Sequence, residues 1–86
     1  MKDKIVWITG ASSGIGEALA YAYSKLGAKL IISSRNSEEL LRVKANCIHK
    51  ADVHVLPLDL EENSSLAGKA DEAVKIFGKI DILINS

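Results

Sequence analysis

The chain has 86 residues, 48% of them hydrophobic and 26% charged, and its 11 Lys and Arg residues balance its 11 Asp and Glu residues. This length allows one small domain, and the composition is that of an ordinary globular protein. Because there is no basic patch for nucleic acid and no apolar run long enough to span a membrane, we expect a cytoplasmic protein without nucleic-acid or membrane partners.

Apolar runs of strand length alternate with helix-like periodic stretches along the whole chain. In order, the expected elements are a strand at 5–9, a helix at 14–26, a strand at 28–33, a helix at 37–48, a strand at 53–56, a helix at 61–77 and a strand at 80–84. Gly27, Asn36 and Gly78 stand where a C-cap, an N-cap and a helix stop are expected. This alternation predicts an α/β, Rossmann-like three-layer βαβαβαβ arrangement, half of a doubly wound parallel sheet with strand order 3-2-1-4.

The apolar pattern also predicts which side chains are buried. In the first helix, one apolar face is expected from residues that recur at helical spacing, namely Ile15, Ala18, Leu19, Ala22, Tyr23 and Leu26. The single cysteine, Cys47, can form no internal disulfide, and its place on the second helix beside Ile48 predicts a buried thiol. The run from Ile82 to Ile84 is typical of an interior strand, yet the expected order leaves it at an edge, so we expect it to be more exposed than residues 5–8.

A glycine-rich turn, Thr9-Gly10-Ala11-Ser12-Ser13-Gly14-Ile15-Gly16, joins the first strand to the first helix. Gly10 would let the chain turn off the strand, Gly14 would let a pyrophosphate approach the backbone, and Gly16 would let the helix pack closely. Backbone N–H groups at a helix N-terminus favour an anion there. The G-x-x-x-G-x-G spacing differs from the commonest dinucleotide fingerprint, and the glycines alone could equally form a flexible loop.

The octapeptide from Thr9 to Gly16 resembles the cofactor motif of the classical short-chain dehydrogenases/reductases. The resemblance implies that residues 1–86 form the N-terminal NAD(P)-binding half of the fold, with the catalytic half absent from this chain. It implies an oxidoreductase that transfers hydride between NADP(H) and a small-molecule carbonyl or alcohol, and that is a homo-oligomer when complete. The extended epimerases and dehydratases fit less well, because their glycine turn usually reads G-x-x-G-x-x-G.

The end of the second expected strand indicates which dinucleotide would bind. Dinucleotide-binding folds usually place a carboxylate about 20 residues past the glycine turn, where it bonds the ribose hydroxyls of NAD. Here Ser34 stands at that position and Arg35 follows it. A guanidinium can bind a 2′-phosphate through two charge-assisted hydrogen bonds, so we expect NADP in preference to NAD. The alternative is that Arg35 is a solvated charge at a strand end.

Other segments also resemble the family's cofactor contacts. Asp59 and Leu60 resemble an acid–hydrophobe pair that contacts the adenine, although the Asp could instead cap the next helix. Asn85 matches the first residue of the family's Asn-Asn-Ala-Gly turn, whereas Ser86 replaces the second. Ser13 stands where some NADP-preferring relatives carry Arg or Lys. The expected cofactor-binding residues are therefore Gly10, Ser12, Ser13, Gly14, Ile15, Gly16, Ser34, Arg35, Asp59, Leu60 and Asn85.

The family's catalytic Ser, Tyr-x-x-x-Lys pair and helix Asn lie beyond the Asn-Asn-Ala-Gly turn, so we expect this chain to be inactive alone. Tyr21 and Lys25 have the Tyr-x-x-x-Lys spacing but lie within the first helix, which no substrate pocket precedes. His49 and His54 are expected to be structural or solvated, and no Cys/His pair has metal-ligand spacing. A non-catalytic dinucleotide-binding module and an inert fragment are the alternatives, and the residues beyond Ser86 would distinguish them from the enzyme.

Overall fold

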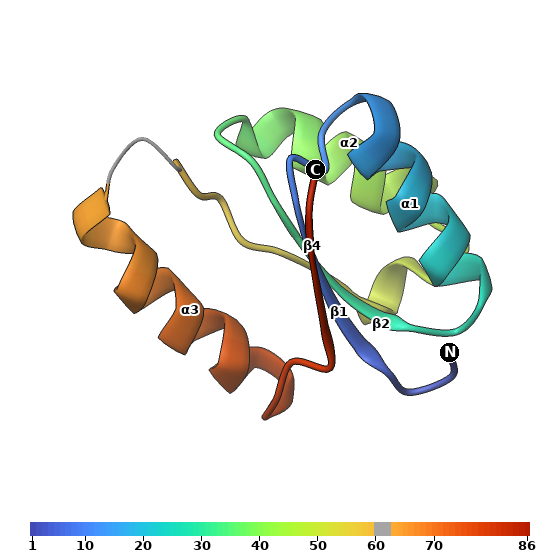
Figure 1. The fold of residues 1–86 in the computed structure, drawn as a ribbon. Helices are drawn as coiled ribbons and strands as arrows, with labels where there is room; N and C mark the ends of the chain where they lie inside the picture. Colours follow the sequence, from blue (N-terminus) through green and yellow to red (C-terminus); the bar gives the residue numbers. More distant parts are fainter. Residues whose placement is uncertain (60–62) are drawn as a thin grey trace.

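The computed structural model describes residues 1–59 and 63–86, which form one sheet between two layers of helices (Figure 1). The elements in chain order are β1 (Ile5–Thr9), α1 (Gly14–Lys25), β2 (Lys29–Ser33), α2 (Ser37–Asn46), the 3₁₀ turn η1 (Lys50–Asp52), β3 (Val53–Val55), α3 (Asn63–Phe77) and β4 (Ile82–Asn85). The sheet has the order β3-β2-β1-β4. The predicted fold class and strand order are confirmed.

All the strand pairs are parallel, and their register places β1 at the centre. Val6 of β1 lies opposite Leu30 of β2 and Ile82 of β4, and Leu30 lies opposite Val53 of β3. Each of the five residues of β1 is buried. This explains the unbroken apolar run, because a central parallel strand with helices on both faces has no solvated side.

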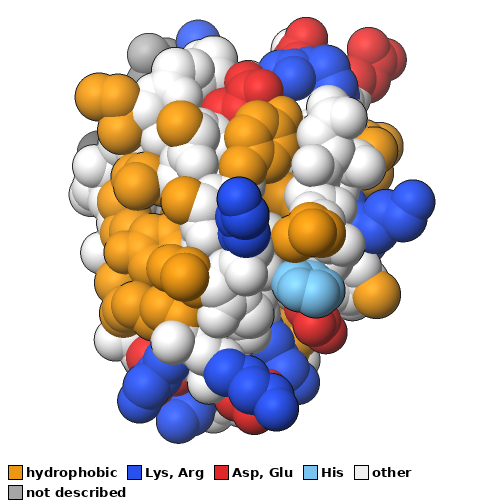
Figure 2. All heavy atoms as spheres, turned by 90° about the vertical axis from the view of Figure 1, so that its right-hand side faces the viewer, with side chains coloured by type: hydrophobic (Ala, Val, Ile, Leu, Met, Phe, Trp, Pro, Cys, Tyr) orange, Lys and Arg blue, Asp and Glu red, His pale blue; other side chains and the backbone are white. Residues whose placement is uncertain are grey.

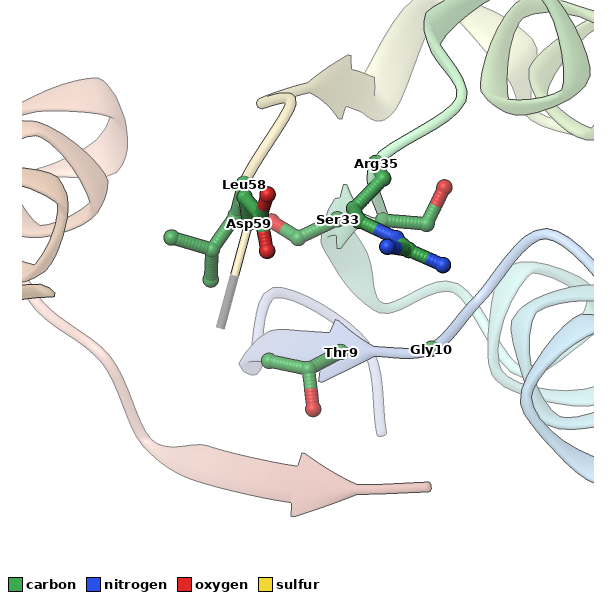
Figure 3. A pocket seen from close by; sticks show the side chains of 7 residues that line it. Thr9, Gly10, Ser33, Arg35, Leu58 and Asp59 are labelled. Atoms are coloured by element: carbon green, nitrogen blue, oxygen red, sulfur yellow. The ribbon is translucent and has the colours of Figure 1, made fainter. Parts of the chain in front are cut away.

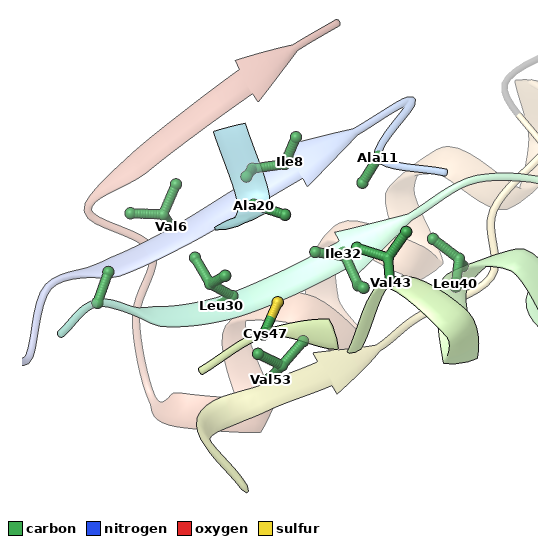
Figure 4. Packing of buried hydrophobic residues seen from close by; sticks show 11 residues of the cluster. Val6, Ile8, Ala11, Ala20, Leu30, Ile32, Leu40, Val43, Cys47 and Val53 are labelled. Carbon is green, nitrogen blue, oxygen red and sulfur yellow. The ribbon is translucent and has the colours of Figure 1, made fainter. Parts of the chain in front are cut away.

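The two faces of the sheet form separate cores, as expected from right-handed crossovers. One core joins alternate residues of β1 and β2 to side chains of α1 and α2 (Figure 4), and it includes Val6, Ile8, Leu30, Ile32, Ala20, Leu40 and Val43. The other joins Ile5, Trp7 and Ile31 to Ala73, Ile76 and Phe77 of α3. The period of two along each strand thus assigns successive side chains to opposite helix layers.

The buried face of α1 differs from the one that the apolar pattern predicts. The residues of α1 that are buried are Gly16, Ala20 and Ser24. Ile15 and Leu26, which were expected on the packed face, are 75% and 59% exposed. Small residues at positions i, i+4 and i+8 let the helix backbone approach the sheet closely, so the larger apolar side chains lie at its flanks and outer surface.

The signals for helix ends are confirmed by the backbone. Gly27 and Gly78, which follow α1 and α3, have φ angles of 87° and 91°. The Asn36 side chain accepts a hydrogen bond of 3.1 Å from the Glu39 N–H at the start of α2. Cys47 is buried as predicted, although it follows α2 as its C-cap rather than lying within it, and burial raises the pKa of its thiol.

β4 is one of the two edge strands of the described sheet, and β3 is the other. Ile82 and Ile84 are half-buried and Leu83 is 55% exposed, whereas residues 5–8 of β1 are 7% exposed or less. The strand begins at Ile82 rather than residue 80, because Asp81 exchanges hydrogen bonds with Ile5: its carboxylate accepts from the Ile5 N–H at 2.8 Å, and its own N–H donates to the Ile5 carbonyl at 2.9 Å. The Ile5 N–H bond lowers the pKa of the Asp81 carboxyl.

Candidate dinucleotide-binding site

A pocket of about 280 Å³ opens at the carboxyl ends of β1 and β2 (Figure 3). Its lining brings together the turn after β1, the turn after β2 and the segment after β3, and consists of Thr9, Gly10, Ser33, Ser34, Arg35, Leu58 and Asp59. The carboxyl edge of a parallel sheet is where open α/β folds place ligands. Four of the predicted site residues, Gly10, Ser34, Arg35 and Asp59, therefore share one concave surface.

The glycine-rich turn leaves the pocket through Gly10 and enters α1 at Gly14. A Cβ on Gly16 would lie 2.2 Å from the Gly10 carbonyl oxygen, so only glycine allows α1 to approach the turn this closely. Gly14 has a φ of 57°, and apart from its chain neighbours and the adjoining backbone of α1 no described heavy atom lies within 4 Å of the position of a Cβ. The backbone at Gly14 therefore borders open space, which is the room that an approaching phosphate group needs.

In the described part of the chain, the first turn of α1 has the uncapped backbone donors that an anion site needs. Ser13 is the N-cap residue, yet its side chain makes no capping hydrogen bond. The first N–H groups of a helix have no partner within the helix, so they stay available to an anion here. The side chain of Ile15 points largely to solvent, and only its backbone N–H is a candidate contact. Ser12, Ser13, Gly14, Ile15 and Gly16 thus lie beside the pocket rather than in its lining.

Ser33, Ser34 and Arg35 form the wall of the pocket at the end of β2. The Ser33 hydroxyl accepts a buried hydrogen bond of 2.8 Å from the indole Nε1–H of Trp7. The Ser34 hydroxyl accepts from the Asn36 N–H at 3.2 Å, which closes a local turn. Arg35 is exposed, and Figure 3 shows its guanidinium on the Gly10 side of the pocket. No ion pair or hydrogen bond holds that guanidinium within residues 1–59 and 63–86, so it is available to a ligand.

The segment after β3 closes the opposite wall. The Leu58 N–H donates to the Ser34 carbonyl oxygen at 2.8 Å, which brings Asp59 to the pocket. Leu60, the other predicted adenine contact, lies outside the described residues. Asn85 is not in the pocket lining, but its Oδ1 accepts a hydrogen bond of 2.5 Å from the Thr9 hydroxyl. Asn85 therefore connects the edge strand to a lining residue.

Three residues of the pocket lining, Thr9, Ser33 and Leu58, were not predicted from the sequence. Thr9 opens the glycine-rich motif, and its position at the last residue of β1 was a usable signal. No sequence pattern around Ser33 or Leu58 indicated that these residues would line a pocket. Their positions follow from the register of β2 and from a hydrogen bond between segments 24 residues apart in the chain.

Tyr21, which has the spacing of the Tyr-x-x-x-Lys pair, and the two histidines do not have the surroundings of catalytic groups. The Tyr21 hydroxyl donates to Glu17 at 2.6 Å, and this bond raises the pKa of Tyr21, the reverse of what a proton-transferring Tyr needs. His49 and His54 are exposed, as expected. Among residues 1–59 and 63–86 there is no group of His, Cys, Asp and Glu that could hold a metal. The same part of the chain contains no helix long and apolar enough to cross a membrane.

The sequence from residue 4 to residue 86 matches a family model described as short chain dehydrogenase. The chain belongs to this family. It is 48% identical over 91 residues to mouse (Mus musculus) dehydrogenase/reductase SDR family member 7, and the match covers 100% of this chain and 27% of that protein. The chain thus spans about a quarter of the length of this relative.

Two solved structures of short-chain oxidoreductases contain the same fold. The 3-ketoacyl-(acyl-carrier-protein) reductase of Brucella melitensis complexed with NADH is 31% identical, with a TM-score of 0.83 over 95% of this chain and 33% of that chain. A metagenomic short-chain oxidoreductase in complex with NADP is 27% identical, with a TM-score of 0.89 over 96% of this chain and 38% of that chain. Solved structures with this fold therefore include one complex with NADH and one with NADP.

Proposed function

We propose that this chain is the dinucleotide-binding portion of an oxidoreductase that transfers hydride between NADP(H) and a small-molecule carbonyl or alcohol. The observation that carries the proposal is the pocket at the carboxyl edge of the sheet, where the start of the glycine turn meets Arg35, whose guanidinium forms no ion pair with any described residue. Family membership and the cofactors named in the two solved complexes support a nicotinamide dinucleotide.

The described residues fit such a cofactor at two places. The first-turn N–H groups of α1 and the open space at Gly14 suit a pyrophosphate, which needs close approach to unpaired backbone donors. The wall formed by Ser34 and Arg35 suits the adenosine ribose, with Asp59 as the candidate adenine contact and Asn85 holding Thr9 in place. When bound, the dinucleotide supplies the hydride. The residues of this chain bind and orient it.

The preference for NADP over NAD follows from charge. A carboxylate at the Ser34 position would accept hydrogen bonds from the two ribose hydroxyls of NAD and would repel a 2′-phosphate. Ser34 is uncharged and therefore does not repel a 2′-phosphate. The adjacent guanidinium of Arg35 can form two parallel charge-assisted hydrogen bonds to that phosphate. Asp59 also lines the pocket, so the 2′-phosphate is expected on the β2 side of the pocket, beside Arg35.

Direct titration of the protein with NADPH and with NADH tests the proposal. We expect saturable binding of both cofactors with NADPH the tighter, since the 2′-phosphate adds a charge-assisted contact. A protein that binds neither would overturn the proposed function, and equal affinities would overturn the cofactor preference alone. Because the 86-residue chain is expected to be inactive alone, hydride transfer is tested in a protein that carries the family's Tyr-x-x-x-Lys pair beyond Ser86, by oxidation of bound NADPH with a panel of aldehydes and ketones. No oxidation in that protein despite binding would favour a non-catalytic dinucleotide-binding module.

A further inference from the structure

Arg42, on the outer side of α2, connects both helices of its layer to the glycine turn. Its Nη2–H donates to the Ser12 carbonyl oxygen at 3.1 Å, and the same guanidinium binds the Glu17 carboxylate through Nη1 at 3.0 Å and Nη2 at 3.1 Å. Its Nε–H also donates to Glu39. We call Ser12, Glu17, Glu39 and Arg42 the Arg42 cluster. Figure 2 shows acidic and basic side chains meeting at the upper end of the face that α1 and α2 form.

The geometry of the Arg42 cluster requires an arginine. One planar guanidinium satisfies two carboxylates and a backbone carbonyl at once, whereas a lysine ammonium has a single charged centre. Glu17 is itself oriented by the Tyr21 hydroxyl at 2.6 Å. Hydrogen bonds from Arg42 and Tyr21 lower the pKa of Glu17 from its usual 4.5 to about 2, so this carboxylate is charged at neutral pH.

The Ser12 carbonyl belongs to a segment with few other restraints. It lies between Gly10 and Gly14, whose φ angles are 63° and 57° and which have more conformational freedom than other residues. On one side of it, the Ala11 N–H donates to the Ser33 carbonyl at 3.1 Å. On the other side, the Glu17 N–H donates to the Ser13 carbonyl at 3.3 Å. Among the described residues, the bond from Arg42 is the side-chain hydrogen bond made to the middle of the turn.

We infer that Arg42 is a positioning residue that holds the glycine turn in the conformation that binds the pyrophosphate of the cofactor. The inference rests on the proposed function. The Arg42 guanidinium bonds the Ser12 carbonyl and does not line the pocket, so we assign its effect to the turn and not to contact with the adenosine half of the ligand. Because NADPH and NADH share the pyrophosphate, loss of Arg42 must weaken both to the same degree. Arg35, in contrast, is expected to affect NADPH alone.

The test is Arg42→Met, which keeps the apolar stem of the side chain and removes the guanidinium. We expect the Kd values for NADPH and NADH to rise together by about three- to fivefold, the scale of a partly exposed ion-pair network, with their ratio unchanged. Arg42→Lys should recover part of this loss through a single contact to Glu17. Val43→Ala is the control for stability, since Val43 is the buried neighbour of Arg42 on α2 and its side chain makes no hydrogen bond to the turn.

Two readouts separate positioning from general stability. In Arg42→Met without cofactor, amide hydrogen exchange at residues 11–15 should become about three- to fivefold faster than in wild type, while Val43→Ala should leave it unchanged under conditions where both variants are folded. Unchanged exchange, unchanged Kd values, a loss confined to NADPH, or an equal loss in Val43→Ala would each overturn the inference. If the wild type binds neither cofactor, the proposed function fails, and the exchange comparison still decides whether Arg42 orders the turn.

Discussion

Ser34 and Arg35 carry the proposed choice of cofactor in two adjacent side chains. The Ser34 hydroxyl is engaged in a local turn with Asn36, so its contribution is the absence of a charge rather than a directed bond. Arg35 is a cation at the pocket wall that forms no ion pair with any described residue. This preference should be sensitive to single substitutions, because it depends on the positive charge of Arg35 and on the absence of a carboxylate at position 34.

Arg35→Ala should weaken NADPH binding by about ten- to a hundredfold and leave NADH binding nearly unchanged, since a charge-assisted hydrogen bond contributes roughly 1.5–3 kcal/mol. Isothermal titration with both cofactors measures the two affinities. Lys75→Ala, which removes an exposed cation from α3 away from the pocket, is the control for net charge.

An unchanged ratio of NADPH to NADH affinity in Arg35→Ala would mean that another group holds the 2′-phosphate. The reciprocal change, Ser34→Asp, keeps an acceptor for the Asn36 N–H and adds the carboxylate that NAD-binding folds place here. It should shift the preference toward NADH.

Gly14 has a backbone conformation that favours glycine, and its Cβ position borders the open space proposed for the phosphate. Its φ of 57° means that Gly14→Val would be strained in the folded protein, so loss of binding in that variant would be ambiguous. Gly14→Asn is the better change, because Asn tolerates this backbone region and still fills the open space. We expect cofactor affinity to fall by about tenfold or more, equivalent to at least ~1.4 kcal/mol.

Gly78→Asn is the matched control for Gly14→Asn. Gly78 also has a positive φ, of 91°, and no heavy atom within 4 Å of the position of a Cβ, but it follows α3 and is absent from the pocket lining. Circular dichroism should show both variants folded, with binding lost only in Gly14→Asn. Full NADPH affinity in a folded Gly14→Asn protein would contradict the phosphate site at the start of α1.

At the level of elements, charge links α1 to α2 where packing between them is limited. Arg42 and Glu17 bridge the two helices at 3.0 Å, and Ser24 of α1 accepts the His49 N–H at 3.1 Å just after α2. Of the two residues in this bridge, Glu17 is the one whose protonation can be changed by acid, because its pKa is lowered to about 2. The direction in which its protonation changes the free energy of unfolding can therefore be predicted. A depressed pKa means that the native state binds the proton less readily than the unfolded chain does, so the bridge stabilises the fold while Glu17 is ionised.

The contribution of Glu17 should be complete above about pH 4.5 and should be lost as the pH falls toward about 2. Urea unfolding of wild type and Glu17→Gln at pH 7, 4 and 2.5 measures it. The difference in unfolding free energy between the two proteins should be largest at pH 7 and should shrink at each step. A difference that stays constant across this range would show that Glu17 stabilises through packing and not through its charge.

For the whole molecule, the central strand β1 is buried whereas the edge strand β4 is partly exposed, and this difference bears on how chains associate. Leu83 of β4 is 55% exposed, and within the described residues β4 pairs on one side only, with β1. The layer of α3 covers Ile5, Trp7 and Ile31, and Lys29 adds a cation contact 5.7 Å from the centre of the Phe77 ring. An exposed apolar edge strand is a site at which chains pair with one another.

We expect the 86-residue chain to self-associate through β4, and Leu83→Lys to reduce that association, because a charge on an edge strand opposes pairing. Leu41→Lys is the control, since Leu41 is similarly exposed, at 57%, but lies on α2. Sedimentation velocity over a concentration series measures the distribution of species. A monomeric wild type, or equal effects of the two substitutions, would contradict association through the edge.

The elements, their order and the glycine-rich turn between β1 and α1 could be predicted from the sequence because each depends on neighbours in the chain. Periodicity distinguishes strand from helix, Gly27, Asn36 and Gly78 mark helix ends, and the right-handed crossover rule turns alternation into the order 3-2-1-4. Gly10, Ser34, Arg35 and Asp59, each expected from the sequence to contact the cofactor, line one pocket because the parallel strands that they follow end at one edge of the sheet.

Only the tertiary structure decided which face of α1 is buried and which distant side chains meet. Gly16, Ala20 and Ser24 are buried because small residues permit close helix–sheet packing, which outweighs the hydrophobicity of Ile15 and Leu26. The bond from Trp7 to Ser33 and the bonds from Arg42 to Glu17 and Ser12 join residues 25 to 30 positions apart. Strand register and the angle between packed helices set such contacts, and no local pattern in the sequence encodes either one.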